Sequence, residues 1–214
     1  MTNTLHNKIK EYVNGLFEYI LAPALIFHNL THTQNVVKNT MEIAGHCNIR
    51  ENEMLILFAA AWFHDTGHLF TEPKNHEEAG CFIMRQFMFD KVDDIDIISD
   101  IERCIMATKL PRNPQNLLQQ IICDADVYHF GTEEFQENNK RALEEHILKY
   151  GETDLIQFSK DTIEMLEDHS FYTHYCKELL NEQKENNLIT LQMKIFETEK
   201  HERKHTGNQC KSSL

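Results

Sequence analysis

The chain has 214 residues, of which 41% are hydrophobic and 26% are charged, with only seven Gly and four Pro. This composition excludes a fibrous or disordered chain and is typical of a helical globular protein of one domain. The formal net charge of -13 opposes binding to nucleic acid or anionic lipid, although a small phosphorylated ligand, which needs only a local cation, is still allowed. No segment reaches the roughly 18 apolar residues that span a bilayer, and the N-terminus lacks a basic segment followed by an apolar one. We therefore expect a soluble, cytoplasmic protein.

The cysteines give no sign of a disulfide framework. They are far apart, and none forms a Cys-x-x-Cys pair. Four of the six lie among apolar residues, as small core side chains do. We therefore expect free thiols at Cys47, Cys81, Cys104, Cys123, Cys176 and Cys210.

Apolar residues recur every three to four positions in the first part of the chain, which predicts helices. The first helix should run from about Leu5 to Leu21. Asn29 or Thr31 can cap a second helix, and His32 then lies in its first turn. A third helix is predicted from about Glu51 to Asp65.

The middle of the chain predicts three more helices. Two of them cover Glu77 to Phe89 and Ile95 to Thr108. Two prolines then interrupt the pattern, and a helix that begins near Leu117 leads into Asp124 and Asp126.

The last part of the chain shows the same spacing in three segments, Glu133 to Tyr150, Leu155 to His169 and Phe171 to about Phe196. No alternating strand pattern and no Asn-Gly hairpin signal competes with helix. Residues 197–214 have no apolar face and are predicted to form a charged, disordered tail. The sequence thus predicts an all-α protein, with a single helical bundle over residues 1–196.

The most informative feature is the pair His64 and Asp65, at the end of an apolar helical run that begins at Leu55. A histidine and an aspartate that leave the core together gain little from burial unless a positive charge holds them. No Lys or Arg lies between Arg50 and Lys74. A metal ion is therefore the better candidate.

His32 and Asp126 could join this pair. Each lies at a helix end or on a helix face beside apolar residues, where ligands from separate helices can converge. Two imidazoles and two carboxylates form a mixed nitrogen and oxygen set that suits Fe, Mn, Co, Ni or Zn rather than Ca. His64 and Asp65 are about 100° apart on a helix and can meet one ion beside its end. Isolated histidines are more often ordinary core or surface residues, so the residues alone make the metal site a hypothesis.

The order of a first histidine, a His-Asp pair and a distant aspartate resembles the HD superfamily of metal-dependent phosphohydrolases. The segment FHNLTHTQNVV (27–37) resembles the opening motif of that family, and AAAWFHDTGHL (59–69) resembles its His-Asp motif. NHEEAG (75–80) is similar to a segment that commonly follows. Residues 105–131 resemble the closing part in a bacterial branch of small HD domains, and LEDHSFYT (166–173) is a weaker similarity.

The resemblance implies a single HD domain with a motif core of residues 27–131. It implies four metal ligands, His32, His64, Asp65 and Asp126. Asp124 is the alternative to Asp126, because the Asp-Ala-Asp step offers two carboxylates. We prefer Asp126. Asp124 is about 200° around the helix and could instead hydrogen-bond a ligand histidine.

Many relatives bind two metals through additional histidines after the His-Asp motif. Here His68 and His76 are the candidates, but the position after Lys109 that carries histidine in some relatives is Leu110. We therefore expect one tightly held ion per chain, with His68 and His76 directed at the substrate or at a weak second ion. For His68, a position in a solvated loop is an equally good interpretation.

A phosphorylated substrate would also need cations near the metal. By the same resemblance Lys109 and Arg112 line the pocket, and Lys74 lies on the loop after the His-Asp motif. Each could neutralise a phosphoryl oxygen, although isolated lysines are usually just solvated. His28 and Asn29 are expected to shape the turn before the second helix rather than to contact substrate.

The leading hypothesis is a metal-dependent phosphohydrolase that cleaves the phosphate ester of a nucleotide or another small phosphorylated metabolite. Asp65 could orient the metal-activated water, while Lys109, with His76 or His68, balances the charge on the phosphoryl oxygens. The alternative is a nucleotide-sensing module that binds without hydrolysis, and the absence of a histidine at Leu110 keeps this alternative open. A di-iron oxygenase needs more histidine ligands than the sequence provides. Fold alone does not decide the substrate.

Overall fold

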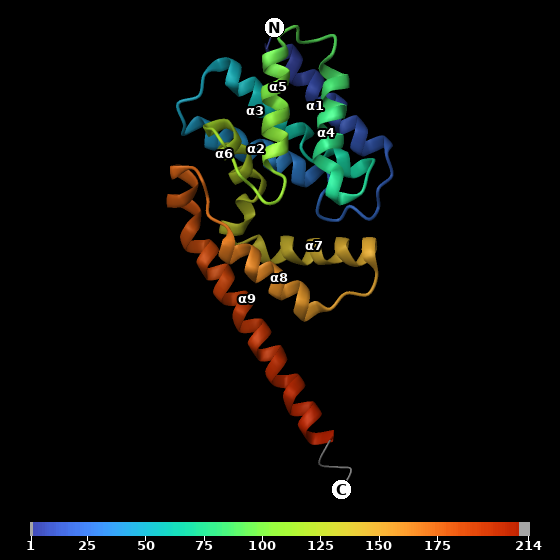
Figure 1. Ribbon diagram of the computed structural model, residues 1–214, viewed down its shortest axis with the longest axis vertical. Coiled ribbons are helices and arrows are strands. Elements are labelled where there is room, and N and C mark those ends of the chain that lie inside the picture. The colour runs from blue at the N-terminus through green and yellow to red at the C-terminus, as the bar shows by residue number, and fades with distance from the viewer. Residues whose placement is uncertain (1, 210–214) are drawn as a thin grey trace.

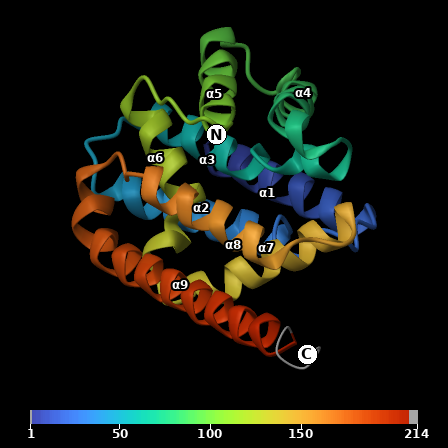
Figure 2. The same ribbon diagram turned by 60° about the horizontal axis from the view of Figure 1, so that its bottom comes forward.

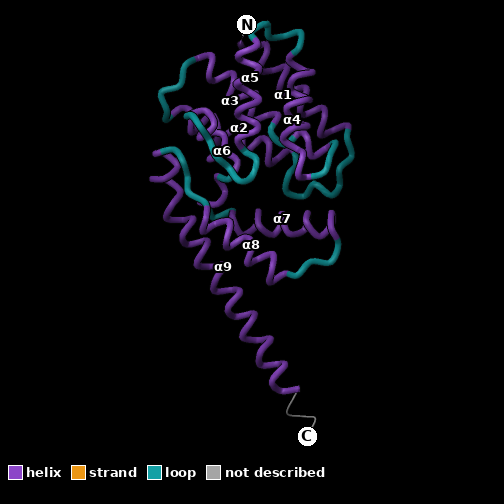
Figure 3. The backbone as a smooth tube through the Cα atoms, in the orientation of Figure 1, coloured by secondary structure: helices purple, strands orange, loops and turns teal. Residues whose placement is uncertain are grey.

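In the computed structural model, residues 2–209 are described, and their regular structure is entirely helical (Figures 1 and 3). The α-helices are α1 (Thr2–Tyr19), α2 (Leu30–Gly45), α3 (Glu51–Phe63), α4 (His76–Met88), α5 (Ile95–Ala107), α6 (Leu117–Asp126), α7 (Phe135–Tyr150), α8 (Leu155–Asp168) and α9 (His174–Gln209). Short 3-10 helices follow α3 (η1, Thr66–Leu69; η2, Pro73–Asn75) and α6 (η3, Tyr128–Gly131). The all-α prediction is confirmed, and the eight helix starts from α2 onward and most helix ends lie within about three residues of those expected.

Helix α3 lies at the centre of the core. It is apolar on all sides, and eight of its 13 residues are buried, as expected for a helix surrounded by others. Helices α1, α2, α4, α5 and α6 all pack against it. The helix ends at Phe63, where the Thr66 hydroxyl donates a hydrogen bond to the Phe63 carbonyl over 2.8 Å. The central helix of the core therefore places His64 and Asp65 at its C-terminal end.

The C-terminal helices form a second group beside the bundle. Helix α8 packs along α9, and η3 packs against both α9 and α7; Figure 2 shows α7, α8 and α9 on one side of α2. The Asn187 amide on α9 donates hydrogen bonds to the carbonyls of Phe130 (2.9 Å) and Thr132 (2.8 Å). The chain that follows Asp126 is thus fixed by a helix some 60 residues later.

Asp124 links α6 to the segment that leads into α9. Its fully buried carboxylate accepts hydrogen bonds from the backbone N–H groups of Tyr172 and Thr173 and from the Thr173 hydroxyl, at 2.7–2.8 Å. The sequence suggested that Asp124 could bond a ligand histidine, and this is corrected. Its hydrogen-bonding capacity is used to hold the chain that enters α9.

Helix α9 is longer than the sequence predicts. It continues to Gln209, and its last part projects from the body of the molecule (Figure 1), whereas residues 197–214 were expected to be disordered. Lys160 forms an ion pair with Glu199 at 2.8 Å, and residues 197–206 contain no Gly or Pro and several good helix formers. Helical propensity therefore extends the helix without an apolar face. Residues 210–214 lie outside the described part of the chain.

Two further findings concern membrane-spanning helices and the cysteines. Within residues 2–209, no helix combines the length and the hydrophobicity needed to cross a bilayer. The cysteines at positions 47, 81, 104, 123 and 176 are free thiols, and Cys210 lies outside the described residues.

Candidate metal centre

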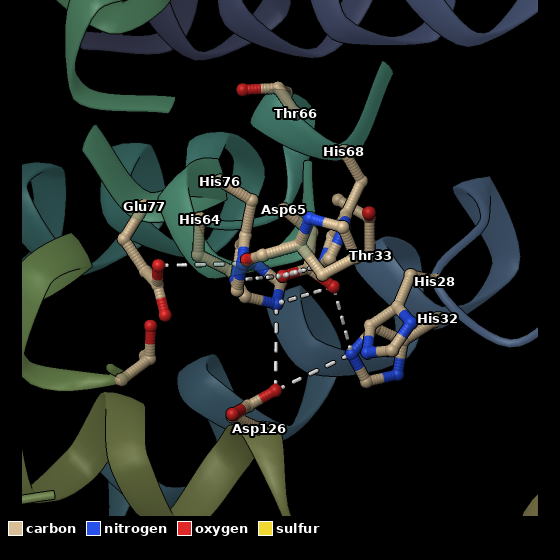
Figure 4. A network of polar contacts seen from close by, with 12 residues as sticks. His28, His32, Thr33, His64, Asp65, Thr66, His68, His76, Glu77 and Asp126 are labelled. Carbon is tan, nitrogen blue, oxygen red and sulfur yellow. Dashed lines mark hydrogen bonds and ion pairs between the residues drawn. The ribbon is translucent and has the colours of Figure 1, made fainter. Parts of the chain in front are cut away.

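Three separate segments of the chain bring the four predicted ligands together. Asn29 caps α2 by accepting a hydrogen bond from the His32 N–H over 3.1 Å, which fixes His32 in the first turn, as the sequence predicts. His64 is the C-cap of α3, and Asp65 follows it. Asp126 is the last residue of α6. All four side chains point to one place (Figure 4).

Each of the two imidazoles lies close to both carboxylates. The His32 Nε2 atom lies 3.4 Å from both Asp65 Oδ2 and Asp126 Oδ1. The His64 Nε2 atom lies 3.3 Å from Asp65 Oδ2 and 3.6 Å from Asp126 Oδ1. Two atoms held about 2.1 Å from one ion at tetrahedral or octahedral angles are roughly 3.0–3.4 Å apart. The geometry therefore fits one shared ion.

The unpaired atoms support the same reading. The Nε2 atoms of His32 and His64 and the Oδ2 atom of Asp65 are buried and have no hydrogen-bond partner among the described residues. Such groups are costly in a folded protein unless a ligand or ion satisfies them. The Nδ1 atom of His64 donates a hydrogen bond to the Ala61 carbonyl over 2.9 Å, which directs Nε2 inward as in metal-binding histidines. Donor type, distance and orientation all fit a divalent transition metal.

The charges within the cluster stabilise one another. Burial alone would lower the pKa of His64, but the carboxylates of Asp65 and Asp126 hold it well above its ordinary value. Burial would raise the pKa of Asp65, but neighbouring imidazoles, His64 first, hold it well below the usual range. The carboxylates are therefore ionised and available as ligands near neutral pH.

Arg112 lies behind the centre rather than in front of it. Its Nη2 atom is 2.5 Å from Asp126 Oδ2, on the oxygen that does not face the histidines. The side chain is only 13% exposed. The sequence placed Arg112 among the substrate-binding cations, whereas its described contact orients the carboxylate of Asp126.

A second group of imidazoles faces the other oxygen of Asp65. His76 Nε2 lies 3.5 Å and His68 Nε2 lies 3.9 Å from Asp65 Oδ1, and the two rings stack at 3.9 Å. Gly67 permits this approach, because a Cβ atom there would lie 1.9 Å from the His76 carbonyl oxygen. His68 is buried, with both ring nitrogens unpaired, so a solvated loop position for it is wrong. Asp65 thus presents one oxygen to each group of histidines.

His28 completes this second group. A ring nitrogen of His28, an Asp65 oxygen and a His68 nitrogen lie within 4.8 Å of one another. His28 Nδ1 is 2.7 Å from Glu145 Oε1, and Glu145 Oε2 accepts the backbone N–H groups of Phe27 and His28 at 2.8 and 3.0 Å. Burial alone would lower the pKa of His28, but the carboxylates of Glu145 and Asp65 raise it. The expectation that His28 only shapes a turn missed this contact.

The remaining predicted residues lie away from the cluster. Lys109 forms an ion pair with Glu78, and Lys74 is exposed in η2. Leu110 is 63% exposed, so the position where some relatives carry a histidine is on the surface here. His68 and His76 supply imidazoles near Asp65 instead.

Asp124 and Asp126 can be separated by isosteric substitution. Asp126→Asn is expected to remove most bound metal, because it removes the charge that faces His32 and His64. Asp124→Asn is expected to keep the metal but to lower the free energy of unfolding by about 2–3 kcal/mol, because charged hydrogen bonds to α9 are weakened. Elemental analysis and urea unfolding measure the two effects. A metal-free Asp124→Asn beside a metal-loaded Asp126→Asn would reverse the assignment.

The fold and the site together define an all-α protein with a cluster of histidines and carboxylates that could hold a metal ion. Residues 29–131 match the family model described as the HD domain. This segment is therefore an HD domain, which supports membership of the chain in the HD superfamily of metal-dependent phosphohydrolases. The matched segment begins at the cap of α2 and ends with η3, so it contains all four predicted ligands. No curated protein and no solved structure matches the chain.

Proposed function

We propose that this protein is a metal-dependent phosphohydrolase that cleaves a phosphate ester of a small metabolite, such as a nucleotide. The observation that carries the proposal is the convergence of unpaired buried atoms of His32, His64 and Asp65 beside Asp126. Membership of the HD superfamily supports the same chemistry.

The residues would hold the metal as follows. His32, His64, Asp65 and Asp126 bind the principal ion, and Arg112 keeps the Asp126 carboxylate in place. Asp65, His68 and His76 would be the residues available to hold a weaker second ion. A bound divalent ion polarises a phosphoryl oxygen and lowers the pKa of water, which makes hydroxide available near neutral pH.

The protein side chains would then manage protons and charge. Glu145 orients His28 through Nδ1, and Nε2 of His28 is left to give a proton to the departing oxygen of the ester. Asp65 would orient the attacking water, and His68 and His76 lie where they can contact the phosphoryl group. Lys109 would have to leave Glu78 to reach that group, so we give it a smaller role than the imidazoles.

Elemental analysis and phosphate release test the proposed function together. Protein purified without added metal is expected to contain at least one transition metal per chain and to release phosphate from monoesters. Removal of the metal by a chelator should abolish release, and added Mn²⁺, Co²⁺, Ni²⁺, Fe²⁺ or Zn²⁺ should restore it. Thermal stabilisation by nucleotides without any phosphate release would instead favour a sensor, and two irons per chain with no hydrolysis would favour oxygen chemistry.

A further inference from the structure

A cavity of about 450 Å³ lies beside the candidate metal centre, and neither His68 nor His76 is among the residues that line it. Two metal ligands, His32 and Asp126, form its inner wall. The rest of the wall comes from the exposed side of α2, from η3 and from the start of α7. Its volume is in the range of small-molecule sites. A phosphoryl group held at the metal could therefore extend its organic part into this space.

Three asparagines on this wall have unused hydrogen-bonding capacity. Asn35 and Asn39 lie on α2, and Asn138 lies on α7. Within the described part of the chain their side-chain amides make no hydrogen bond, whereas Asn29 and Tyr128 on the same wall are bonded to Ile26 and Glu42. An amide offers two donors and one acceptor with two lone pairs. Three free amides around one cavity suit a ligand that is itself rich in donors and acceptors.

The charges of the wall limit the ligand to one phosphoryl group. The wall carries three carboxylates, of Asp126, Glu133 and Glu134, and two cations, Lys38 and Arg141. Arg141 is already paired with Glu137 at 3.2 Å. Lys38 is in no ion pair among the described residues, so it would be the one available cation of the wall besides the ion held by His32 and Asp126, facing the carboxylates of Glu133 and Glu134. Further phosphates beyond the first would meet carboxylates without an excess of cations.

One part of the wall, the segment around Phe130 and Thr132, is held in place by α9. Burial lowers the pKa of His129 to about 3, so this imidazole is neutral and uncharged toward the ligand. The loop from Phe130 to Thr132 is held by the Asn187 amide of α9. A wall segment that is held in place loses little entropy on binding, which favours selective recognition.

We propose that this cavity binds the neutral, hydrogen-bonding part of a phosphate monoester, a sugar or a nucleoside, and that Asn35, Asn39 and Asn138 determine specificity. This rests on the proposed function, because the metal centre is taken to hold the phosphoryl group. It moves the expected substrate contacts from Lys74, Lys109 and Arg112 to α2 and α7. It also predicts that monophosphates are preferred to triphosphates.

The test compares kcat/KM for nucleoside 5′-monophosphates and sugar phosphates with that for para-nitrophenyl phosphate, which lacks such groups. Asn39→Ala and Asn138→Ala are each expected to lower the ratio for the best monoester about three- to tenfold. Gln34→Ala, an exposed amide on α2 outside the cavity, should leave the ratio unchanged. Equal losses on both substrates, or the same loss in Gln34→Ala, would overturn the proposal. Whether nucleotides or sugar phosphates respond identifies the ligand class.

Two further measurements separate this inference from the proposed function. If no ester is hydrolysed, calorimetry with free nucleosides and sugars on the metal-loaded protein still tests the cavity. Binding that weakens in Asn39→Ala and Asn138→Ala would support the cavity without hydrolysis, and no binding by either class would overturn it. Triphosphates turned over as fast as the matching monophosphate would contradict the charge argument.

Discussion

A variant that carries both His64→Ala and Asp65→Ala is expected to contain no transition metal and to release no phosphate. The two substitutions remove one of the two inward-facing imidazoles and the carboxylate of Asp65, which faces both groups of histidines. Loss of a single preorganised group at an active site can cost about 10²–10³ in rate, so the double variant should fall to background. Elemental analysis and phosphate release should fail together.

The control for this variant is a matched pair on the surface. His174 is 84% exposed and Asp93 is exposed, so His174→Ala with Asp93→Ala removes the same side-chain types far from the centre. That variant should keep both metal and activity. Hydrolysis by a metal-free His64→Ala, Asp65→Ala protein would contradict the mechanism.

Local sequence patterns were sufficient for most of the fold. Helix positions follow from the spacing of apolar residues, which tertiary packing here reinforces rather than overrides. The clearest failure is α9 beyond Phe196, where the absence of an apolar face was read as disorder. A projecting helix of Glu, Lys and Arg needs no apolar face if it continues from a packed helix, because extension avoids the cost of nucleation.

The convergence of the four proposed ligands could be predicted because each lies in a motif with a local structural cause, such as the cap at Asn29 or the end of α3. The contacts that were missed join distant segments. Glu145 is 117 residues from His28 in the sequence. Nothing in the sequence distinguishes Glu145, which is buried, from the exposed glutamates near it. Asp124 and Asp126 lie on different sides of α6, as helical geometry predicts: Asp124 bonds Tyr172 and Thr173, whereas Asp126 faces His32 and His64. Two further ion pairs depend on how the helices pack, which no local pattern encodes. They join Lys109 to Glu78 and Arg112 to Asp126.

His28→Asn should affect substrates according to their leaving groups. An alkyl ester departs as a basic alkoxide that needs a proton, so its kcat is expected to fall by about 10²–10⁴ when the donor is lost. para-Nitrophenyl phosphate releases a stable phenolate, and its kcat should fall far less. The same pattern, in weaker form, is expected for Glu145→Gln, because Glu145 holds His28 through Nδ1 at 2.7 Å. The measurement is kcat for both esters at constant metal loading.

The matched control is His146→Asn, the histidine next to Glu145 on α7, whose ring contacts Tyr150 and Phe158 instead of the metal centre. It should change neither substrate's kcat. An equal loss on both esters in His28→Asn, accompanied by a lower metal content, would assign His28 to the second group of metal ligands instead of to proton transfer. Because Asp65, His68 and His28 lie within 4.8 Å of one another, the leaving-group dependence distinguishes these roles where distance alone does not.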